Sequence, residues 1–325
     1  MKGLRRWLAG LTLLLAVVQQ PALVGADRIS LYPGYSNGQR LLVEGRIVEA
    51  RSTTTIRESD DRLTNLWRNL RYFFNDERQG QTVTLHLQDQ AWTLVSDAEG
   101  YFSLDTPHPP LLPGWHQIMA ESHGHQGQGR LLVVPRENRL GLISDLDDTL
   151  LISEVTRKHR LLGNTFLKNP AQRQVVPGMA ALLARVAAAN PRPEAAPLFY
   201  LSASPRQLQD GIADFLERNA FPAGVLLTKQ IREDGGGDPL LDQFAYKTRK
   251  IEGILARLPG VRFLLLGDDG EKDPEIYAWI QKLYPERVAG IWIRRVSPPL
   301  RQPLPPGQRD LAEVLAATSL PELAP

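Results

Sequence analysis

Three clusters of polar residues, each directly after a mostly apolar run, are the part of the sequence that could do chemistry. The first is Asp145-Leu146-Asp147-Asp148-Thr149, which follows residues 140–144. Alternate residues of an extended strand end point to the same side, so we expect Asp145 and Asp147 side by side. Two neighbouring carboxylates suit a nucleophile next to a general acid/base. The alternative is a loop of turn-forming aspartates, because Asp is common in turns.

The second cluster begins at Ser202, which ends the apolar run 198–201 and precedes Ala203-Ser204-Pro205. A hydroxyl and free backbone N–H groups at a strand-to-helix turn can bind a phosphoryl oxygen. The third cluster is the segment 267–273, Gly-Asp-Asp-Gly-Glu-Lys-Asp. Clustered carboxylates with nearby glycines suit a hard cation that takes oxygen ligands, such as Mg²⁺. The spacing does not match an EF-hand, so a structural Ca²⁺ site is the lesser alternative.

Electrostatics connects the clusters, because several carboxylates cannot surround a phosphate without added positive charge. Asp145, Asp147, Asp268 and Asp273 would each repel it by about 4 kcal/mol per close pair at an effective dielectric near 20. A divalent cation can supply most of the positive charge, and a lysine that opens a helix can supply the rest. Lys247 has that placement. The alternative for Lys247 is an ordinary solvated surface lysine.

The second half of the chain has the pattern that could position these residues. From about residue 139, buried apolar strands alternate with helical stretches, which indicates an α/β fold with a doubly wound parallel sheet. The predicted strands are 140–144, 198–202, 261–267 and 290–294, and the predicted helices are 178–189, 208–219, 247–258 and 274–283. Each polar cluster follows one of these strands. In open parallel sheets, ligands bind beyond the carboxyl ends of the strands.

The first half reads as a small antiparallel β-domain. Short strands are expected at 41–48 and 82–87, in a turn and strand over 96–102, and at 130–134. A helix is predicted over 59–74, because large apolar residues recur there at helical spacing. This helix is expected to pack on its own sheet. A helix that faces a partner or a membrane is the alternative.

The first 26 residues have the order of a secretory signal peptide. Lys2, Arg5 and Arg6 precede an apolar run over 7–18, and small residues end at Ala26, where we expect cleavage. The run is shorter than the about 20 residues that span a bilayer. We therefore expect an exported protein, periplasmic or secreted. The predicted organisation is a signal peptide (1–26), a β-rich domain (27–137), a catalytic domain (138–296) and a proline-rich tail with a short helix (297–325).

Composition excludes several function classes. The 325 residues are 42% hydrophobic and 23% charged, which is typical of a globular protein of two domains. Without cysteine, the chain has no disulfide, thiolate zinc site or cysteine nucleophile. The leader holds three basic residues and no acidic one, so the formal charge of +2 becomes −1 after cleavage. No nucleic-acid partner is expected, because binding to a phosphate backbone needs a cationic face.

The order and spacing of these clusters resemble the haloacid dehalogenase superfamily. Within it, residues 140–296 are similar to the actin-patch phosphatidate phosphatase family, through the segments 164–170, 176–179, 200–205 and 267–277. The resemblance implies a Mg²⁺-dependent phosphatase in which Asp145 attacks phosphorus. Asp147 would protonate the leaving oxygen and then activate water. Thr149, Ser202 and Lys247 would bind the phosphoryl group, while Asp145, Asp147 (through its carbonyl), Asp268, and Asp269 or Asp273 would serve the metal.

The substrate implied is a phosphomonoester, with phosphatidate or a related phospholipid as one candidate. The segment 154–170 combines basic and apolar residues, so it could meet an anionic lipid at a membrane surface. It could equally be a cap helix that packs on the domain. The rival function is a non-catalytic module that binds phosphorylated components of the cell envelope. The sequence does not indicate any protein partner.

Overall fold

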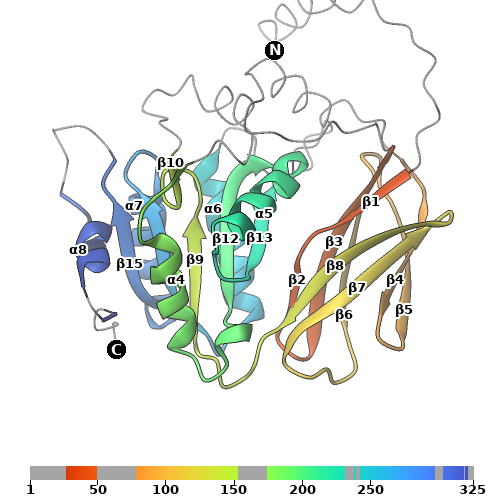
Figure 1. Ribbon diagram of the computed structural model, residues 1–325, viewed down its shortest axis with the longest axis horizontal. Helices are drawn as coiled ribbons and strands as arrows, with labels where there is room; N and C mark the ends of the chain where they lie inside the picture. Colours follow the sequence, from red (N-terminus) through yellow and green to blue (C-terminus); the bar gives the residue numbers. More distant parts are fainter. Residues whose placement is uncertain are drawn as a thin grey trace, which may run out of the picture.

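The structure is a computed structural model that describes residues 27–49, 78–152, 174–230, 238, 242–296, 303–317 and 319–320. A β-domain and an α/β domain lie side by side in it (Figure 1). The predicted signal peptide, the predicted helix over 59–74 and the segment 154–170 lie outside the described residues. These three stay predictions. No helix in the described ranges is long and apolar enough to cross a bilayer.

The β-domain is one curled sheet of eight strands. They are β1 (Asp27–Leu31), β2 (Gly34–Ser36), β3 (Arg40–Glu49), β4 (Thr82–Leu87), β5 (Gln90–Val95), β6 (Tyr101–Pro107), β7 (Gly114–Ser122) and β8 (His125–Val133). The order is β1-β3-β2-β8-β7-β4-β5, and β6 pairs with β3. All pairs are antiparallel except β2 with β8. Strands β5 and β6 contact each other, so the sheet encloses its core.

Alternation of apolar and polar residues explains which side of this sheet is buried. In β4, Val83, Leu85 and Leu87 are buried, while the residues between them face outward. They join a core with residues from β1, β3, β6, β7 and β8. The predicted antiparallel β-domain is therefore confirmed. The sequence did not predict the first half of β8, because His125–Gly129 has no apolar alternation.

The second domain contains a six-stranded parallel sheet in the order β13-β12-β9-β14-β15-β16. Its strands are β9 (Leu140–Asp145), β12 (Leu198–Pro205), β13 (Val225–Lys229), β14 (Arg262–Asp268), β15 (Val288–Arg294) and β16 (Gln308–Asp310). A separate hairpin-like pair consists of β10 (Leu151–Ile152) and β11 (Gln174–Val175). The chain winds first to one side of β9 and then to the other. The order therefore reverses between β9 and β14, which is where doubly wound sheets bind ligands.

Helices cover both faces of this sheet. They are α4 (Met179–Ala188), α5 (Gln209–Arg218), α6 (Gln243–Arg257), α7 (Asp273–Leu283) and α8 (Leu311–Ala316), with 3₁₀ turns η3 (Pro193–Ala195), η4 (Arg206–Leu208) and η5 (Pro285–Arg287). Helices α4, α5 and α8 share one core with residues such as Leu264 and Leu266. Helices α6 and α7 pack with Phe263 and Leu265 on the other face. Successive residues of β14 thus serve opposite cores, which explains its continuous apolar sequence.

The β-domain packs against the face that carries α6 and α7. Tyr35, Leu132 and Val134 of the β-domain are buried in the same core as the residues of that face. The Tyr35 ring meets the buried ring of Phe199 edge-on, with their centroids 5.0 Å apart. The two domains therefore share apolar packing in addition to the connecting chain.

The predicted α/β class and doubly wound sheet are confirmed, with differences at element ends. Helix α6 begins at Gln243, four residues before the predicted start, because the Asp242 side chain accepts a hydrogen bond from the N–H of Ala245. The tail contributes strand β16, which was not predicted, before the expected helix α8. Strand β13 was not predicted, although Pro222 and Gly224 precede it as turn residues.

Candidate active site

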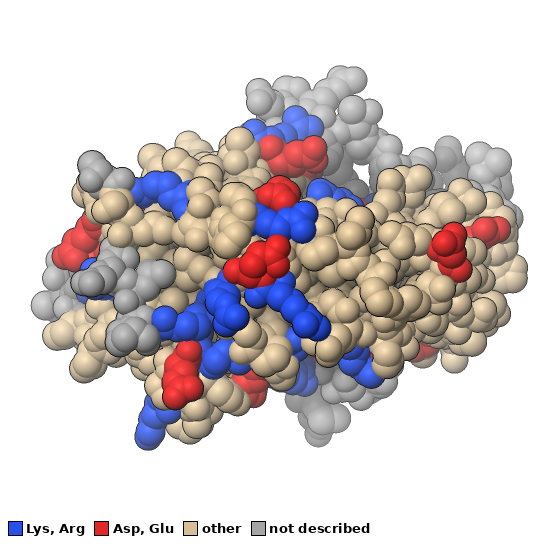
Figure 2. All heavy atoms as spheres, turned by 90° about the horizontal axis from the view of Figure 1, so that it is seen from below, with Lys and Arg blue, Asp and Glu red and all other residues tan. Residues whose placement is uncertain are grey.

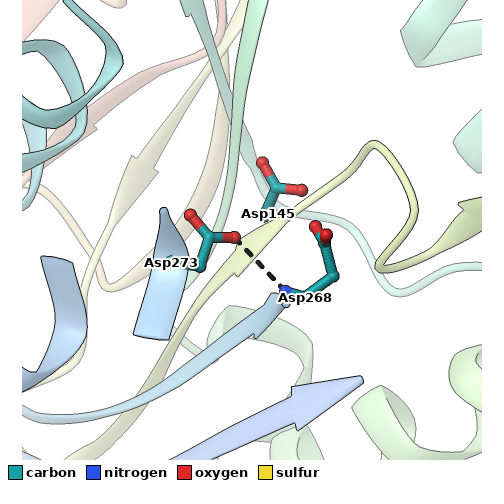
Figure 3. Close-up of side chains that lie close together, drawn as sticks. All are labelled: Asp145, Asp268 and Asp273. Atoms are coloured by element: carbon teal, nitrogen blue, oxygen red, sulfur yellow. Dashed lines mark hydrogen bonds between the residues drawn. The ribbon is translucent and has the colours of Figure 1, made fainter. Parts of the chain in front are cut away.

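Three buried carboxylates meet where β9 and β14 end. Asp145 is the last residue of β9, Asp268 is the last of β14, and Asp273 is the first of α7. One oxygen from each lies within 4.8 Å of the other two. Figure 3 shows the three side chains facing a common space, with the Asp268 N–H directed at Asp273. The cluster lies at the point where the strand order reverses.

Strand register explains how the chain brings these residues together. Ser144 pairs with Leu266, so the residues that follow in each strand leave the sheet side by side. Between them, Gly267 leaves room for Asp273, because a Cβ at position 267 would lie 2.4–2.8 Å from atoms of its carboxyl group and Cβ. A side chain at position 267 would therefore push Asp273 out of the cluster.

Lys247 of α6 is the positive partner of this cluster. Its Nζ lies 2.8 Å from Oδ1 of Asp145, contacts Oδ1 of Asp273, and lies 3.5 Å from Oε2 of Glu271. The lysine is fully buried. Sequence analysis did not assign a role to Glu271, although it lies within the acidic segment 267–273. Its position in the sequence, as an acidic residue between Asp268 and Asp273, could have identified it.

Burial and mutual repulsion dominate the electrostatics of the cluster. Burial raises the pKa of Asp145 well above its ordinary value, against the opposing effect of Lys247. Burial and the neighbouring Asp273 raise the pKa of Asp268 to about 8. Burial alone would lower the pKa of Lys247, but Asp145 and Asp273 raise it well above its ordinary value. The lysine therefore stays charged and offsets one of the three carboxylates.

The cluster fits a bound divalent cation. Its donor atoms are all carboxylate oxygens, which is the ligand type that Mg²⁺ prefers. Oδ2 of Asp145 is buried and accepts no hydrogen bond from the described residues. A buried carboxylate oxygen without a partner is costly. A cation would satisfy this oxygen and balance the charge that Lys247 leaves uncompensated.

The other predicted residues surround the cluster. The Thr149 hydroxyl donates to Oδ2 of Asp268 at 3.4 Å, and the Ser202 hydroxyl donates to Oδ2 of Asp147 at 3.3 Å. The turn from Asp147 to Thr149 includes Asp148 at φ 56°, whose carbonyl accepts a hydrogen bond from Arg294. The strand ends therefore place both predicted phosphate-binding hydroxyls next to predicted catalytic or metal-binding aspartates.

Asp269 and Asp273, which the sequence left as alternatives for the metal, have different surroundings. Asp273 lies in the cluster. The Asp269 carboxylate accepts hydrogen bonds from Nε of Arg295 at 2.7 Å and from the N–H of Val296 at 2.6 Å. Asp269 therefore anchors the chain after β15, and the geometry favours Asp273 as the acid near the metal.

A cavity of about 290 Å³ lies at the other end of the sheet, where the strands begin. Its lining includes Arg136 and Arg139 of the interdomain linker and residues 258–261, and no carboxylate. Figure 2 views this end, where basic side chains gather around acidic ones. The cavity therefore lacks the carboxylates that gather at the carboxyl ends of the strands, where the described residues suited to chemistry lie.

Comparison with known proteins agrees with this assignment of the domain. Residues 140–295, just under half of the chain, match the family described as "Phosphatidate phosphatase APP1, catalytic domain". The matched range begins at the first residue of β9 and ends just after β15. It includes every residue of the cluster.

Two curated proteins are similar to parts of this chain. The phosphatidate phosphatase APP1 of Saccharomyces cerevisiae is 30% identical over 161 residues, which are 49% of this chain and 26% of that protein. An uncharacterised protein of Schizosaccharomyces pombe is 26% identical over 216 residues, 63% of this chain and 34% of that protein. The chain thus spans about a third or less of these relatives. A carbohydrate acetylesterase from Xanthomonas citri is 11% identical, with a TM-score of 0.29 over 81% of this chain and 66% of that one.

Removing the Asp273 carboxylate should weaken Mg²⁺ binding, whereas removing that of Asp269 should not. We expect Asp273→Asn to lower Mg²⁺ affinity by about 10-fold or more, because its oxygens lie in the cluster. Asp269→Asn is the matched control, and its affinity should stay within about threefold, since its partners are Arg295 and Val296. Isothermal titration calorimetry measures both. A larger loss in the control would exchange the two roles.

The stability of the chelated protein should depend on pH through Asp268. Its pKa of about 8 exceeds its ordinary value of 3.8, so between these limits the folded state binds more protons than the unfolded state. The cluster's contribution to the free energy of unfolding therefore falls as pH rises through this range. Urea unfolding in chelator should show wild type losing stability relative to Asp268→Asn, whose amide does not titrate. A difference that is independent of pH would contradict the raised pKa.

Proposed function

We propose that the chain is a Mg²⁺-dependent phosphatase that hydrolyses a phosphomonoester through a phosphorylated aspartate at position 145. The observation that carries this proposal is the position of Asp145, buried at the switch point of the sheet with Lys247 on one oxygen and none of the described hydrogen-bond donors on the other. The second oxygen of this carboxylate is therefore available to a metal ion or to phosphorus. The family match over residues 140–295 supports the same chemistry.

In the first step, an oxygen of Asp145 forms a bond to phosphorus while the bond from phosphorus to the leaving oxygen breaks. Asp147 donates its proton to that oxygen, so that the alcohol leaves neutral. Its carboxyl group contacts the Ser202 hydroxyl, which supports a location next to the phosphoryl group. Lys247 balances negative charge on the transferring group.

In the second step, water attacks the phosphorylated Asp145, and Asp147, now ionised, accepts the water proton. The bond between Asp145 and phosphorus breaks, and inorganic phosphate is released. Asp147 thus serves as general acid in the first step and as general base in the second. The Ser202 hydroxyl, which donates to its carboxyl group, holds it in place for both steps. Burial of the site limits competing contact with bulk water.

Asp145, Asp268 and the backbone carbonyl of Asp147 would hold Mg²⁺, and Asp273 would orient its waters. The bound cation would neutralise charge on the phosphoryl oxygens and orient the phosphate toward Asp145. In the part of the chain that the structure describes, Gly270 donates to Asp268 at 2.7 Å, which fixes that carboxylate for the role.

The proposed substrate is phosphatidate or a related phospholipid. The support is the description of the matched family and of the yeast relative, each of which names a phosphatidate phosphatase. We also propose that the protein acts outside the cytoplasm, on the basis of the leader over residues 1–26. These two proposals concern the substrate and the cellular location of the protein. The proposed reaction at Asp145 does not depend on either of them.

Asp145→Asn should abolish turnover and leave the fold intact, because an amide oxygen is a poor nucleophile and the change is nearly isosteric. We expect a loss of at least about 1000-fold in kcat, measured by phosphate release in the presence of Mg²⁺. Asp214→Asn, an exposed aspartate on α5, is the matched control and should keep full activity. Turnover at about a tenth of the wild-type rate would remove the covalent mechanism.

The substrate class can be tested with headgroup-matched substrates. We expect kcat/KM to be at least about 10-fold higher for phosphatidate in vesicles than for glycerol 3-phosphate, which has the same phosphomonoester without acyl chains. The assay should lose activity in chelator and regain it with Mg²⁺. Equal values for the two substrates would reject the phospholipid and retain the phosphatase. No turnover on either, with phosphate binding intact, would favour a binding module instead.

A further inference from the structure

An ion pair between a buried arginine and a half-buried glutamate connects the β-domain to the end of strand β12. Arg206 opens the turn η4, four residues after Ser202, and its side chain is 4% exposed. Its Nη2 lies 2.6 Å from Oε2 of Glu44 in β3. The two residues are 162 positions apart in the sequence. The β-domain thus holds the chain directly beyond the predicted phosphate-binding serine.

Aromatic rings of the β-domain enclose the same guanidinium. Its Cζ lies 5.0 Å from the ring centroid of Tyr32 and 5.8 Å from that of Tyr101, and both tyrosines are buried. Burial alone would lower the pKa of Arg206, but Glu44 raises it above its ordinary value. A buried guanidinium is strongly unfavourable without an anionic partner. Arg206 therefore depends on Glu44 for its position.

The backbone at Ser202 needs such an anchor, because the sheet does not hold it. Strand β12 pairs with β9 only up to Leu201. Its register with β13 is interrupted after Leu201 and resumes at Pro205. In this part of the described chain, residues 202–204 have no ladder partner. Within this segment, the Ser204 N–H donates to the Ser202 Oγ at 3.0 Å, and the Tyr246 hydroxyl donates to the Ser202 carbonyl at 2.9 Å. The Arg206 ion pair lies just beyond Pro205.

We propose that Arg206 is a positioning residue for catalysis, through which Glu44 of the β-domain fixes the turn that carries the Ser202 hydroxyl. The inference deepens the proposed phosphatase function and rests on it. The β-domain then completes the phosphate-binding turn, in addition to covering one face of the sheet. Loss of the Glu44 charge would release Arg206 and let residues 202–204 move relative to Asp145.

Glu44→Gln removes the charge and keeps the shape. We expect kcat for a soluble phosphomonoester to fall about 10-fold, less than the about 100-fold or more that follows complete loss of a donor to the transition state. Because Ser202 already binds the phosphoryl group of bound substrate, KM should also rise. Glu44→Asp keeps the charge on a shorter side chain and should restore part of kcat. If Glu44→Gln does not fold, Arg206→Gln removes the other member of the pair, and an unchanged kcat in that variant overturns the proposal.

Asp105 provides the matched control, since it is also an acid of the β-domain that reaches across the interface. Its Oδ2 lies 2.6 Å from Nη2 of Arg257, at the end of α6. This pair is ten residues, about 15 Å along the helix, from Lys247. It lies next to Leu258, which lines the cavity at the end of the sheet where the strands begin. Asp105→Asn should lose less stability than Glu44→Gln, because Asp105 is 42% exposed, and it should keep kcat within about twofold.

The experiment compares wild type, Glu44→Gln, Asp105→Asn, Ser202→Ala and the double variant Glu44→Gln/Ser202→Ala. If Glu44 acts through Ser202, the double variant should be no more than about twofold slower than Ser202→Ala, because coupled residues are not additive. Equal rates for Glu44→Gln and Asp105→Asn, or a full additional loss in the double variant, would overturn the proposal.

A structural measurement separates this inference from the proposed function. Crystal structures of the two single variants should show the Ser202 Oγ displaced by about 1 Å or more in Glu44→Gln and unmoved in Asp105→Asn. If wild type hydrolyses no phosphomonoester, the proposed function fails, and a displaced or unmoved Ser202 still decides whether Glu44 positions the turn. An unmoved Ser202 in Glu44→Gln overturns the inference.

Discussion

The contact between Lys247 and Asp145 is the interaction on which the rest of the site depends. A fully buried ammonium group would be strongly destabilising alone, and so would the carboxylates around it. The ammonium group and the carboxylates stabilise each other. Because the carboxylates outnumber the lysine, the remaining negative charge favours a bound cation. This requirement fixes several features at once. Helix α6 must begin near the sheet, β9 and β14 must be neighbours, and Gly267 must lack a side chain so that Asp273 can approach.

Local sequence patterns predicted the parts of the structure that depend on local interactions. Apolar strands and helical periodicity located β9, β12, β14 and β15, and the carboxyl ends of the first three located the polar clusters. The choice between Asp269 and Asp273 was different, because both are acids of one short segment. The structure favours Asp273, because the Asp269 carboxylate binds Arg295, which lies 26 positions further along the chain and follows another strand. No spacing rule within the segment contains that information.

The role of the β-domain was inaccessible from sequence for the same reason. Glu44 lies in a strand that reads as an ordinary alternating one, and Arg206 reads as a charged residue at a turn. Their function can be inferred only from their pairing in the folded structure, across 162 positions of the sequence. The family match over residues 140–295 includes Arg206 and excludes Glu44. A catalytic domain defined by that match alone therefore contains a buried cation without its partner.

Strand β16, in the segment after residue 296, is the edge strand of the parallel sheet. It pairs in parallel with β15 from Ile291 to Ile293, and α8 packs against both strands. Without it, the N–H and C=O groups along that side of β15 would be unpaired, on a strand whose residues are almost all buried. Such an edge is a template for pairing with another chain. The pairing of β16 with β15 therefore limits edge-to-edge association of this sheet with other chains.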